Sequence, residues 1–208
     1  MKQKLLTILL AILIAPIGLT AQEVYMESGK VILDMSDTGE GIGLPAGAVI
    51  ATPKYVGKDT APASGTLLFG AGDVTNLVTG SINATVYRKL EIAPRDMGTS
   101  GVLVASGTGD GMSWTNGFNR CKSLSYNGIT ANKWRLPTQR ELTLIWIFKT
   151  AIDDLIGGST TFIGNLYWTS NENDASNVWH VDFSTGVVWY NPKSYTSNRV
   201  RCVREITE

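Results

Sequence analysis

The chain has 208 residues, and its 18 lysines and arginines balance its 18 aspartates and glutamates, so the formal net charge is zero. A near-neutral chain without a basic run lacks the electrostatic signature of proteins that bind nucleic acid or anionic membrane surfaces. Its length suits one large or two small domains and is sufficient to bury a hydrophobic core.

Residues 1–21 have the pattern of a secretory signal peptide. Two lysines precede an apolar run from Leu5 to Leu19, and small residues follow it. The run is shorter than the roughly 20 apolar residues of a transmembrane helix, although a retained membrane anchor remains the alternative. We therefore expect cleavage near Ala21 and a mature protein without a membrane span that is secreted, periplasmic or at the cell surface.

Residues 22–97 predict a small β-rich N-terminal module. This stretch is rich in glycine, alanine, threonine and valine, and it contains no tryptophan. Glycine and proline separate its short apolar runs, which is typical of all-β modules. The expected strands cover residues 30–34, 47–51, 65–69 and 82–92.

The composition changes at about residue 98, and all six tryptophans follow this point. The patterns of residues 98–208 predict a strand at 102–104, a helix at 114–125 and four aromatic strands at 166–169, 178–183, 187–190 and 198–205. In the second aromatic strand, Trp179, Val181 and Phe183 alternate with His180 and Asp182, which predicts that the two sets lie on opposite faces.

The stretch from Trp134 to Leu142 predicts the start of the main core helix. Pro137 disfavours helical backbone for the residue before it, so the chain arrives extended. Thr138 and Glu141 have the spacing of a capping box, which begins a helix. Because the following residues up to 152 are apolar on most faces, we expect one buried helix over residues 139–152.

Cys121 and Cys202 are the two cysteines of the chain. In an exported protein an even number of cysteines indicates a disulfide, which would link the first helix to the last strand. A crosslink across a loop of this length stabilises by roughly 4–5 kcal/mol in the chain-entropy model. A metal site lacks further ligands of suitable spacing, and nothing near either cysteine supports a nucleophile paired with His180.

The order of these motifs resembles the Lcl C-terminal domain family, the bacterial C-type-lectin-like family typified by the C-terminal domain of a collagen-like adhesin. The motifs are Trp-Arg-Leu-Pro-Thr-x-x-Glu-Leu from Trp134, Tyr-Trp-Thr-Ser from Tyr167, Val-Trp-x-Val-x-Phe-x-x-Gly from Val178 and Val-Arg-Cys-Val-Arg from Val200. The resemblance covers about residues 98–206.

For residues 98–208, the resemblance implies an α+β, C-type-lectin-like domain with two helices, a twisted antiparallel sheet and terminal strands that lie close together. A disulfide from the first helix to the last strand is usual in this fold, and Cys121 and Cys202 fit its two positions. The second common disulfide of the fold has no cysteines here.

The resemblance also implies binding rather than catalysis, through the loops at residues 170–177 and 189–198. Aromatic side chains beside amides and hydroxyls form adaptable binding surfaces, and sugars are recognised by the same chemistry. The plainer interpretation is that asparagine and serine gather there because these segments are loops. The candidate ligand-binding residues are Asn171, Asn173, Asp174, Asn177, His180, Asp182, Trp189, Tyr190, Asn191, Tyr195 and Asn198.

We predict no cofactor and no metal. Calcium-dependent lectins of this fold carry a Glu-Pro-Asn or Gln-Pro-Asp loop and a Trp-Asn-Asp strand, and this sequence has neither. Glu172, Asp174 and Asp182 could supply oxygen ligands to calcium, but an acidic loop is more often solvated than chelating.

We therefore expect a secreted or cell-surface, adhesin-like protein that binds a glycan or protein on another cell or surface. A structural subunit of a surface fibre is the alternative, with self-assembly through the N-terminal module. The polar tail is also compatible with a retroelement-diversified receptor-binding protein. We do not expect an enzyme, because both cysteines suit a disulfide and His180 is the single histidine.

Overall fold

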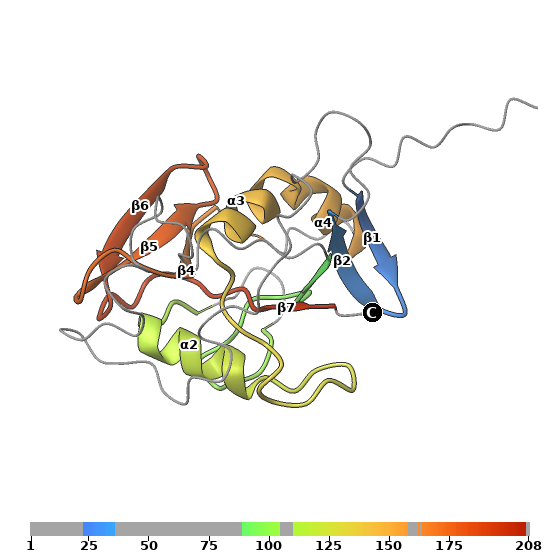
Figure 1. The fold of residues 1–208 in the computed structure, drawn as a ribbon, viewed down its shortest axis with the longest axis horizontal. Helices are drawn as coiled ribbons and strands as arrows, with labels where there is room; N and C mark the ends of the chain where they lie inside the picture. Colours follow the sequence, from blue (N-terminus) through green and yellow to red (C-terminus); the bar gives the residue numbers. More distant parts are fainter. Residues whose placement is uncertain (1–22, 36–88, 105–109, 158–161, 163, 207–208) are drawn as a thin grey trace, which may run out of the picture.

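In the computed structural model, the chain is an α+β protein with three helices and two antiparallel sheets in its described part (Figure 1). The structure describes residues 23–35, 89–104, 110–157, 162 and 164–206. The expected signal peptide, the strands expected at 47–51 and 65–69, and residues 82–88 of the next one lie outside these ranges.

The first sheet is antiparallel throughout and has the strand order β1-β2-β3-β7. Its strands are β1 (Glu23–Glu27), β2 (Lys30–Asp34), β3 (Lys89–Ile92) and β7 (Val203–Glu205). Ser28 and Gly29 join β1 to β2 with φ angles of 50° and 76°, the positive values that a two-residue hairpin turn requires. The sheet thus contains strands from both sides of the boundary expected between residues 97 and 98.

The second sheet has the order β4-β5-β6 and is also antiparallel. Its strands are β4 (Leu166–Glu172), β5 (Asn177–Asp182) and β6 (Val188–Pro192). The three aromatic strands expected in this region are therefore confirmed, with β4 longer than expected. Figure 1 shows this sheet at one end of the molecule and β1 with β2 at the other.

The last expected strand, at residues 198–205, is wrong in its extent, because only β7 pairs as a strand. The residues before it run between other elements instead of along one partner. Arg199 makes an isolated parallel bridge to Tyr167 of β4, and the Met97 amide donates to the Val200 carbonyl at 2.9 Å. The strand expected at 102–104 is likewise reduced to a bridge between Met97 and Leu103.

The first helix is confirmed as α2 (Trp114–Ser123), slightly shorter than expected. The single helix expected over 139–152 is wrong, because the chain forms α3 (Gln139–Ile147) and α4 (Lys149–Leu155), separated at Phe148. The expectation that this helix is buried on all sides is wrong as well, since the Ile147 side chain is 58% exposed. The reason is that α3 packs on β4 and β5 on one side only.

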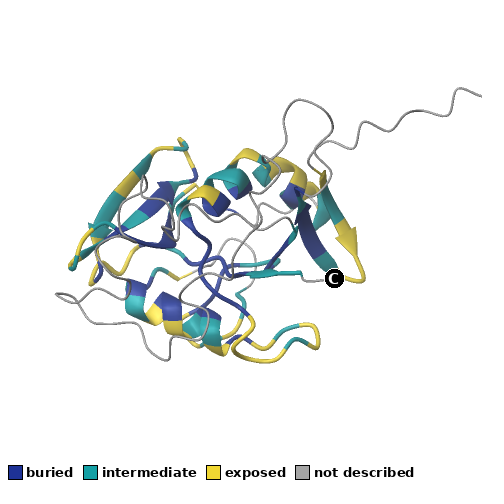
Figure 2. Ribbon diagram, viewed as in Figure 1, coloured by how far each residue is buried: buried dark blue, intermediate teal, exposed yellow. Residues whose placement is uncertain are grey.

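Strand β4 contributes side chains to two hydrophobic clusters. Figure 2 shows buried residues toward the middle of the molecule and exposed ones mainly at its rim. Trp168 packs in the cluster that contains Trp114 and Phe118 of α2. The neighbouring Tyr167 packs in the cluster that contains Leu142 of α3. Because successive side chains of a strand point to opposite faces, both faces of β4 are buried and the strand becomes the shared wall of the core.

The Trp-Arg-Leu-Pro-Thr motif fastens the start of α3 to β7. The Arg135 guanidinium donates to both carboxylate oxygens of Glu141 at 2.7 and 2.9 Å, and both side chains are buried. Glu141 and Thr138 also form the expected capping box. The backbones of Arg135 and Val203 exchange two hydrogen bonds of 2.9 Å, so the motif holds a helix start and a strand together.

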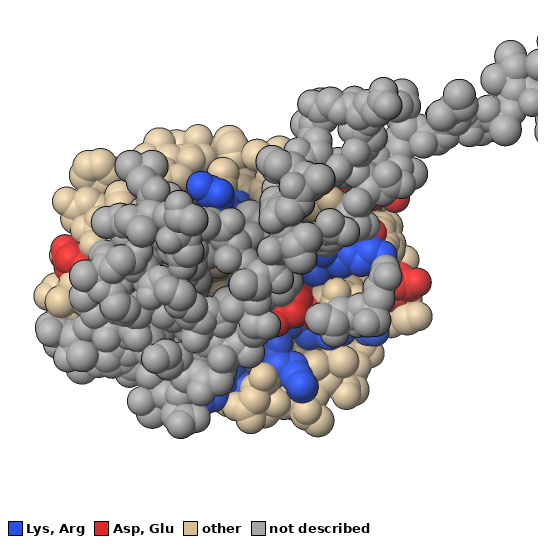
Figure 3. Space-filling model, viewed as in Figure 1, with Lys and Arg blue, Asp and Glu red and all other residues tan. Residues whose placement is uncertain are grey.

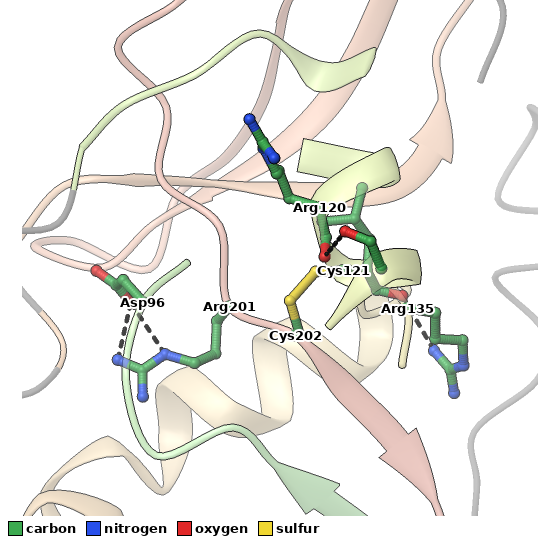
Figure 4. The surroundings of a disulfide bond; sticks show 8 residues. Asp96, Arg120, Cys121, Arg135, Arg201 and Cys202 are labelled. Atoms are coloured by element: carbon green, nitrogen blue, oxygen red, sulfur yellow. Dashed lines mark hydrogen bonds and ion pairs between the residues drawn. A yellow bond between two sulfur atoms is a disulfide. The ribbon is translucent and has the colours of Figure 1, made fainter. Parts of the chain in front are cut away.

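The disulfide between Cys121 and Cys202 is confirmed and links α2 to the residue before β7 (Figure 4). The two Cα atoms lie 5.4 Å apart and the residues are separated by 81 positions. Arg201, next to Cys202, reaches a different element and donates to the Asp96 carboxylate at 2.9 Å. This stretch of chain is therefore fixed on both sides.

None of the helices in the described residues is long and apolar enough to cross a bilayer. On the face drawn in Figure 3, basic and acidic side chains lie side by side over the half that carries β1 and β2 in Figure 1. The described part of that face therefore mixes both signs of charge, in keeping with the balanced composition.

Replacing both cysteines with alanine is expected to lower the free energy of unfolding by about 2–5 kcal/mol, because the unfolded chain loses a crosslink across a long loop. Chemical denaturation with and without dithiothreitol measures this change. The reductant should destabilise the wild type by a similar amount and leave the double variant unchanged; a wild type indifferent to reduction would contradict the role of the disulfide.

Glu141→Gln is expected to destabilise the protein by about 1.5–3 kcal/mol, because it removes the charged partner of two buried Arg135 hydrogen bonds and leaves Arg135 with the 3.4 Å contact to Glu205. Glutamine preserves the shape and suits the capping box, so the loss reports the ion pair. Arg140→Gln, on the exposed side of the same helix turn, is the control and should cost less than about 0.5 kcal/mol. Equal losses for the two variants would rule out this explanation.

Candidate functional site

Three aromatic side chains form a continuous group on β5 and β6, and we call Trp179, Trp189 and Tyr190 the aromatic edge. The strand register pairs Trp179 with Tyr190, and their rings meet edge to face with centroids 5.6 Å apart. The Trp189 and Tyr190 rings are stacked at 5.1 Å with an interplanar angle of 15°. Trp189 is 58% exposed and presents its ring to solvent, whereas Trp179 and Tyr190 are partly buried.

The turn between β5 and β6 positions the aromatic edge. Gly186 has a φ of 80°, and a Cβ there would lie 2.5 Å from the Trp146 ring of α3. Glycine is therefore required by both the backbone conformation and the close packing. Since turn geometry sets hairpin register, this contact fixes which residues of β6 lie beside Trp179.

A buried ion pair holds the two loops near the aromatic edge. Lys193 is 2% exposed, and its Nζ lies 2.5 Å from Glu172 Oε1 and 5.0 Å from the centre of the Trp114 ring. The Lys193 amide also donates to the Ser176 carbonyl at 2.8 Å. The loop after β4 and the loop after β6 are thus joined, and Tyr195, which is 41% exposed, follows directly from this junction.

Asp174 organises the loop between β4 and β5. Its Oδ1 accepts hydrogen bonds from the Ser176 amide at 2.7 Å and the Asn177 amide at 2.8 Å, and the Asn177 side chain donates to both of its oxygens. Hydrogen bonding by the Asn177 side chain, joined by these amides and Asn173, lowers the pKa of Asp174 below its usual value. Asp174, Asn173 and Asn177 therefore satisfy one another within the loop.

Asp182 plays the same part in the turn between β5 and β6. The Ser184 amide and hydroxyl donate to its Oδ1 at 2.8 and 2.6 Å, and the Thr185 hydroxyl donates to Oδ2 at 2.9 Å. Desolvation by burial acts to raise the pKa of Asp182, but these hydrogen bonds outweigh it and the pKa lies below its usual value.

The three carboxylates considered for calcium are thus engaged within the protein: Glu172 by Lys193, and Asp174 and Asp182 by their own turns. Within the described residues, no three histidine, cysteine, aspartate or glutamate side chains come together as a metal site. The chemistry that this part of the molecule offers to a ligand is consequently aromatic and amide chemistry.

Three of the expected ligand-binding residues lie in the interior. Asn171 sits in a bulge of β4, and its Oδ1 accepts from the Gln139 amide at the start of α3 at 2.7 Å. Asn198 accepts from the Asn191 side chain at 3.1 Å. His180 is 4% exposed beside Trp168, and desolvation lowers its pKa although Asp182 acts in the opposite direction.

Trp189, Tyr190 and Asn191 are consecutive on β6, and Tyr195 lies in the loop that follows. Trp179 belongs with Trp189 and Tyr190, although the alternation of β5 predicts that it shares an apolar face with Val181 and Phe183. The signal that identifies it is the hairpin register, which places Trp179 opposite Tyr190 once the turn at Gly186 is known. Its Nε1 is buried and has no hydrogen-bond partner among the described residues.

A model of the Lcl C-terminal domain matches residues 89–204, more than half of the chain. The chain belongs to the Lcl C-terminal domain family. The match begins at the first residue of β3 and includes the disulfide, the Trp134 motif and the aromatic edge. The resemblance stated from about residue 98 is confirmed, and the Lcl C-terminal domain starts one strand earlier than expected. A search of the curated proteins found no match.

Asp182→Ala is expected to lower the melting temperature at pH 7, with a difference from the wild type that narrows in acid. Because the pKa of Asp182 is lower in the folded than in the unfolded protein, its stabilisation is complete above about pH 4 and is lost as the pH falls through the folded-state value. Thermal unfolding from pH 7 to pH 2.5 measures this, with the exposed Asp154→Ala as control. If the difference in melting temperature between Asp182→Ala and the wild type stayed constant from pH 7 to pH 2.5, the ionised carboxylate would not be its source.

Proposed function

We propose that this member of the Lcl C-terminal domain family is an adhesin-like protein that binds glycans through the aromatic edge. The observation that carries the proposal is the exposed Trp189 ring, stacked on the partly buried Tyr190 on a strand whose register is fixed. A sugar ring has an apolar C–H face and a polar hydroxyl rim. The first packs on aromatic faces, and the second suits amide and hydroxyl groups such as those of Asn191 and Tyr195.

The rigidity of the site supports this assignment. A binding surface that is already ordered avoids the entropic cost of immobilising side chains when the ligand arrives. Here the Gly186 turn packs on α3, and the Lys193–Glu172 pair fixes the neighbouring loop. The aromatic edge is therefore presented in one arrangement, which favours recognition of a defined partner surface.

We further propose that the fold is C-type-lectin-like and that the protein acts outside the cytoplasm. The disulfide between α2 and the residue before β7 supports the first point, since the resemblance implies a bridge at that place. It also supports the second, because disulfides persist in oxidising compartments. The signal-peptide pattern of residues 1–21 favours the same location, whether secreted, periplasmic or cell-surface. The proposed role needs no enzyme activity and no cofactor.

A protein ligand is the second candidate for the same surface, because aromatic side chains are enriched in protein interfaces as well. Self-assembly is the third and uses a different part of the molecule. β1 lies at the end of its sheet in the described chain, and its Met26 is 45% exposed. An unpaired strand edge of this kind can accept a strand from another chain.

Trp189→Ala is expected to weaken glycan binding by at least about tenfold, since exposed tryptophan at the centre of a binding surface is typically a hot spot. A glycan array identifies the ligand, and calorimetry then compares the variants. Trp189→Tyr should keep part of the affinity, because it retains an aromatic face.

The control is Val102→Ala, which removes another exposed apolar side chain, 61% exposed, away from β6. It should bind as the wild type does. Binding that is unchanged in Trp189→Ala would show that the glycan site lies elsewhere, and a wild type that binds protein but no glycan would favour the second candidate.

A further inference from the structure

A pocket of about 430 Å³ opens between the segment after α2 and strand β7. Its polar lining comes from Thr130, Asn132, Lys133, Arg204 and Glu205, and Ile129 contributes an apolar wall. The volume falls in the usual range of small-molecule sites. The pocket contains none of the residues of the aromatic edge, so it is independent of the proposed glycan site.

Hydrogen bonds hold the first wall of the pocket in place. Asn127 and Gly128 have φ angles of 49° and 77°, and they turn a hairpin in which Tyr126 and Ile129 exchange two backbone hydrogen bonds. Asn132, with a φ of 67°, donates its amide to the Lys122 carbonyl of α2 at 2.7 Å. Lys133 follows directly from this fixed residue.

The second wall is held equally firmly. Arg204 forms an ion pair with the buried carboxylate of Glu91, and its guanidinium lies 5.8 Å from the centre of the Trp134 ring. Val203, the residue before Arg204, exchanges two backbone hydrogen bonds with Arg135, and these connect the two walls. The pocket is therefore preformed, which reduces the cost of binding a ligand.

The charges of the pocket are not balanced. Arg204 is paired with Glu91, and Glu205 Oε2 lies 3.4 Å from the Arg135 Nε. Lys133 is exposed and has no ion pair within the described part of the chain. Glu205 Oε1 has no hydrogen-bond partner among the same residues. The pocket thus offers an unpaired cation, an amide and a hydroxyl on its first wall, and a carboxylate oxygen without a hydrogen-bond partner among the described residues on its second wall.

We infer that this pocket binds a small hydroxycarboxylate. The ligand's carboxylate would pair with Lys133, near the Arg204 guanidinium, in a charge-assisted contact. Its hydroxyl groups would donate to Glu205 Oε1 and exchange hydrogen bonds with Asn132 and Thr130. A simple inorganic anion would make no hydrogen bond to Glu205 Oε1, and a neutral polyol would make no ion pair with Lys133. The lining therefore favours a ligand that carries both a carboxylate and hydroxyl groups.

The test compares D-gluconate with D-glucitol, which differ only in a carboxylate that is replaced by a hydroxymethyl group. Each is titrated into the purified, ¹⁵N-labelled protein and followed by NMR. D-gluconate should shift the amide signals of Gly128, Ile129 and Thr130, and it should bind at least about tenfold more tightly than D-glucitol.

Lys133→Ala should weaken D-gluconate binding by at least about tenfold, and Lys133→Arg should restore most of it. Both changes are at an exposed position, which keeps the fold intact. Arg140→Gln removes a cation of α3 that is not part of the pocket lining, and it should have no effect on D-gluconate binding. Trp189→Ala should also leave D-gluconate binding unchanged, because it alters only the proposed glycan site. Equal binding of the two polyols, sulfate binding as tightly as D-gluconate, or an unchanged Lys133→Ala variant would each overturn the inference.

Discussion

The segment from Arg199 to Val203 is the constraint on which the rest of the structure depends. Its successive residues attach to different elements: Arg199 to β4, Val200 to Met97, Arg201 to Asp96, Cys202 to α2 and Val203 to Arg135. Arg201 is fully buried, and its partner Asp96 also accepts from the Tyr167 hydroxyl at 2.9 Å. A charge in the core is tolerated because it is paired and hydrogen-bonded on every side, and removing one partner is costly. The segment therefore locks the two hydrophobic clusters into one arrangement.

This constraint explains why the recognition surfaces lie at the rim of the molecule. The buried ion pairs hold elements together, as the pairs of Glu172 with Lys193 and of Glu141 with Arg135 show. What remains for a partner is β6, at the end of its sheet in the described chain, and the pocket beside β7. Both are built on elements whose positions are fixed by buried pairs, and sites on rigid elements hold their geometry more accurately than sites on free loops.

Local rules predicted the features whose causes are local. The capping box depends on two residues three positions apart, Thr138 and Glu141, and the β5–β6 hairpin depends on its turn and alternation, so both could be predicted from the sequence. The disulfide followed from the cysteine count and the family resemblance. The interruption between α3 and α4 at Phe148, by contrast, could not be predicted, because no glycine or proline lies there. Period-two alternation separated His180 from the apolar face of β5 but could not show that its own face is covered as well, so the burial of His180, a candidate ligand-binding residue, was not predicted. The extent of the last strand was wrong for a similar reason, since the partners of Arg199 to Cys202 are distant in sequence.

The two proposed sites should differ in their response to salt, because the charges near them are arranged differently. Around the aromatic edge the nearby carboxylates are engaged in turns or in a buried ion pair, as Asp182 and Glu172 show. Stacking and amide hydrogen bonds depend little on ionic strength, so glycan affinity there should be nearly constant between low and physiological salt. Lys133 is an exposed cation, and its attraction for a carboxylate is screened over the Debye length of about 8 Å at 0.15 M ionic strength. A ligand that depended on the pocket would thus be released by salt, while one held by Trp189 and Tyr190 would remain bound.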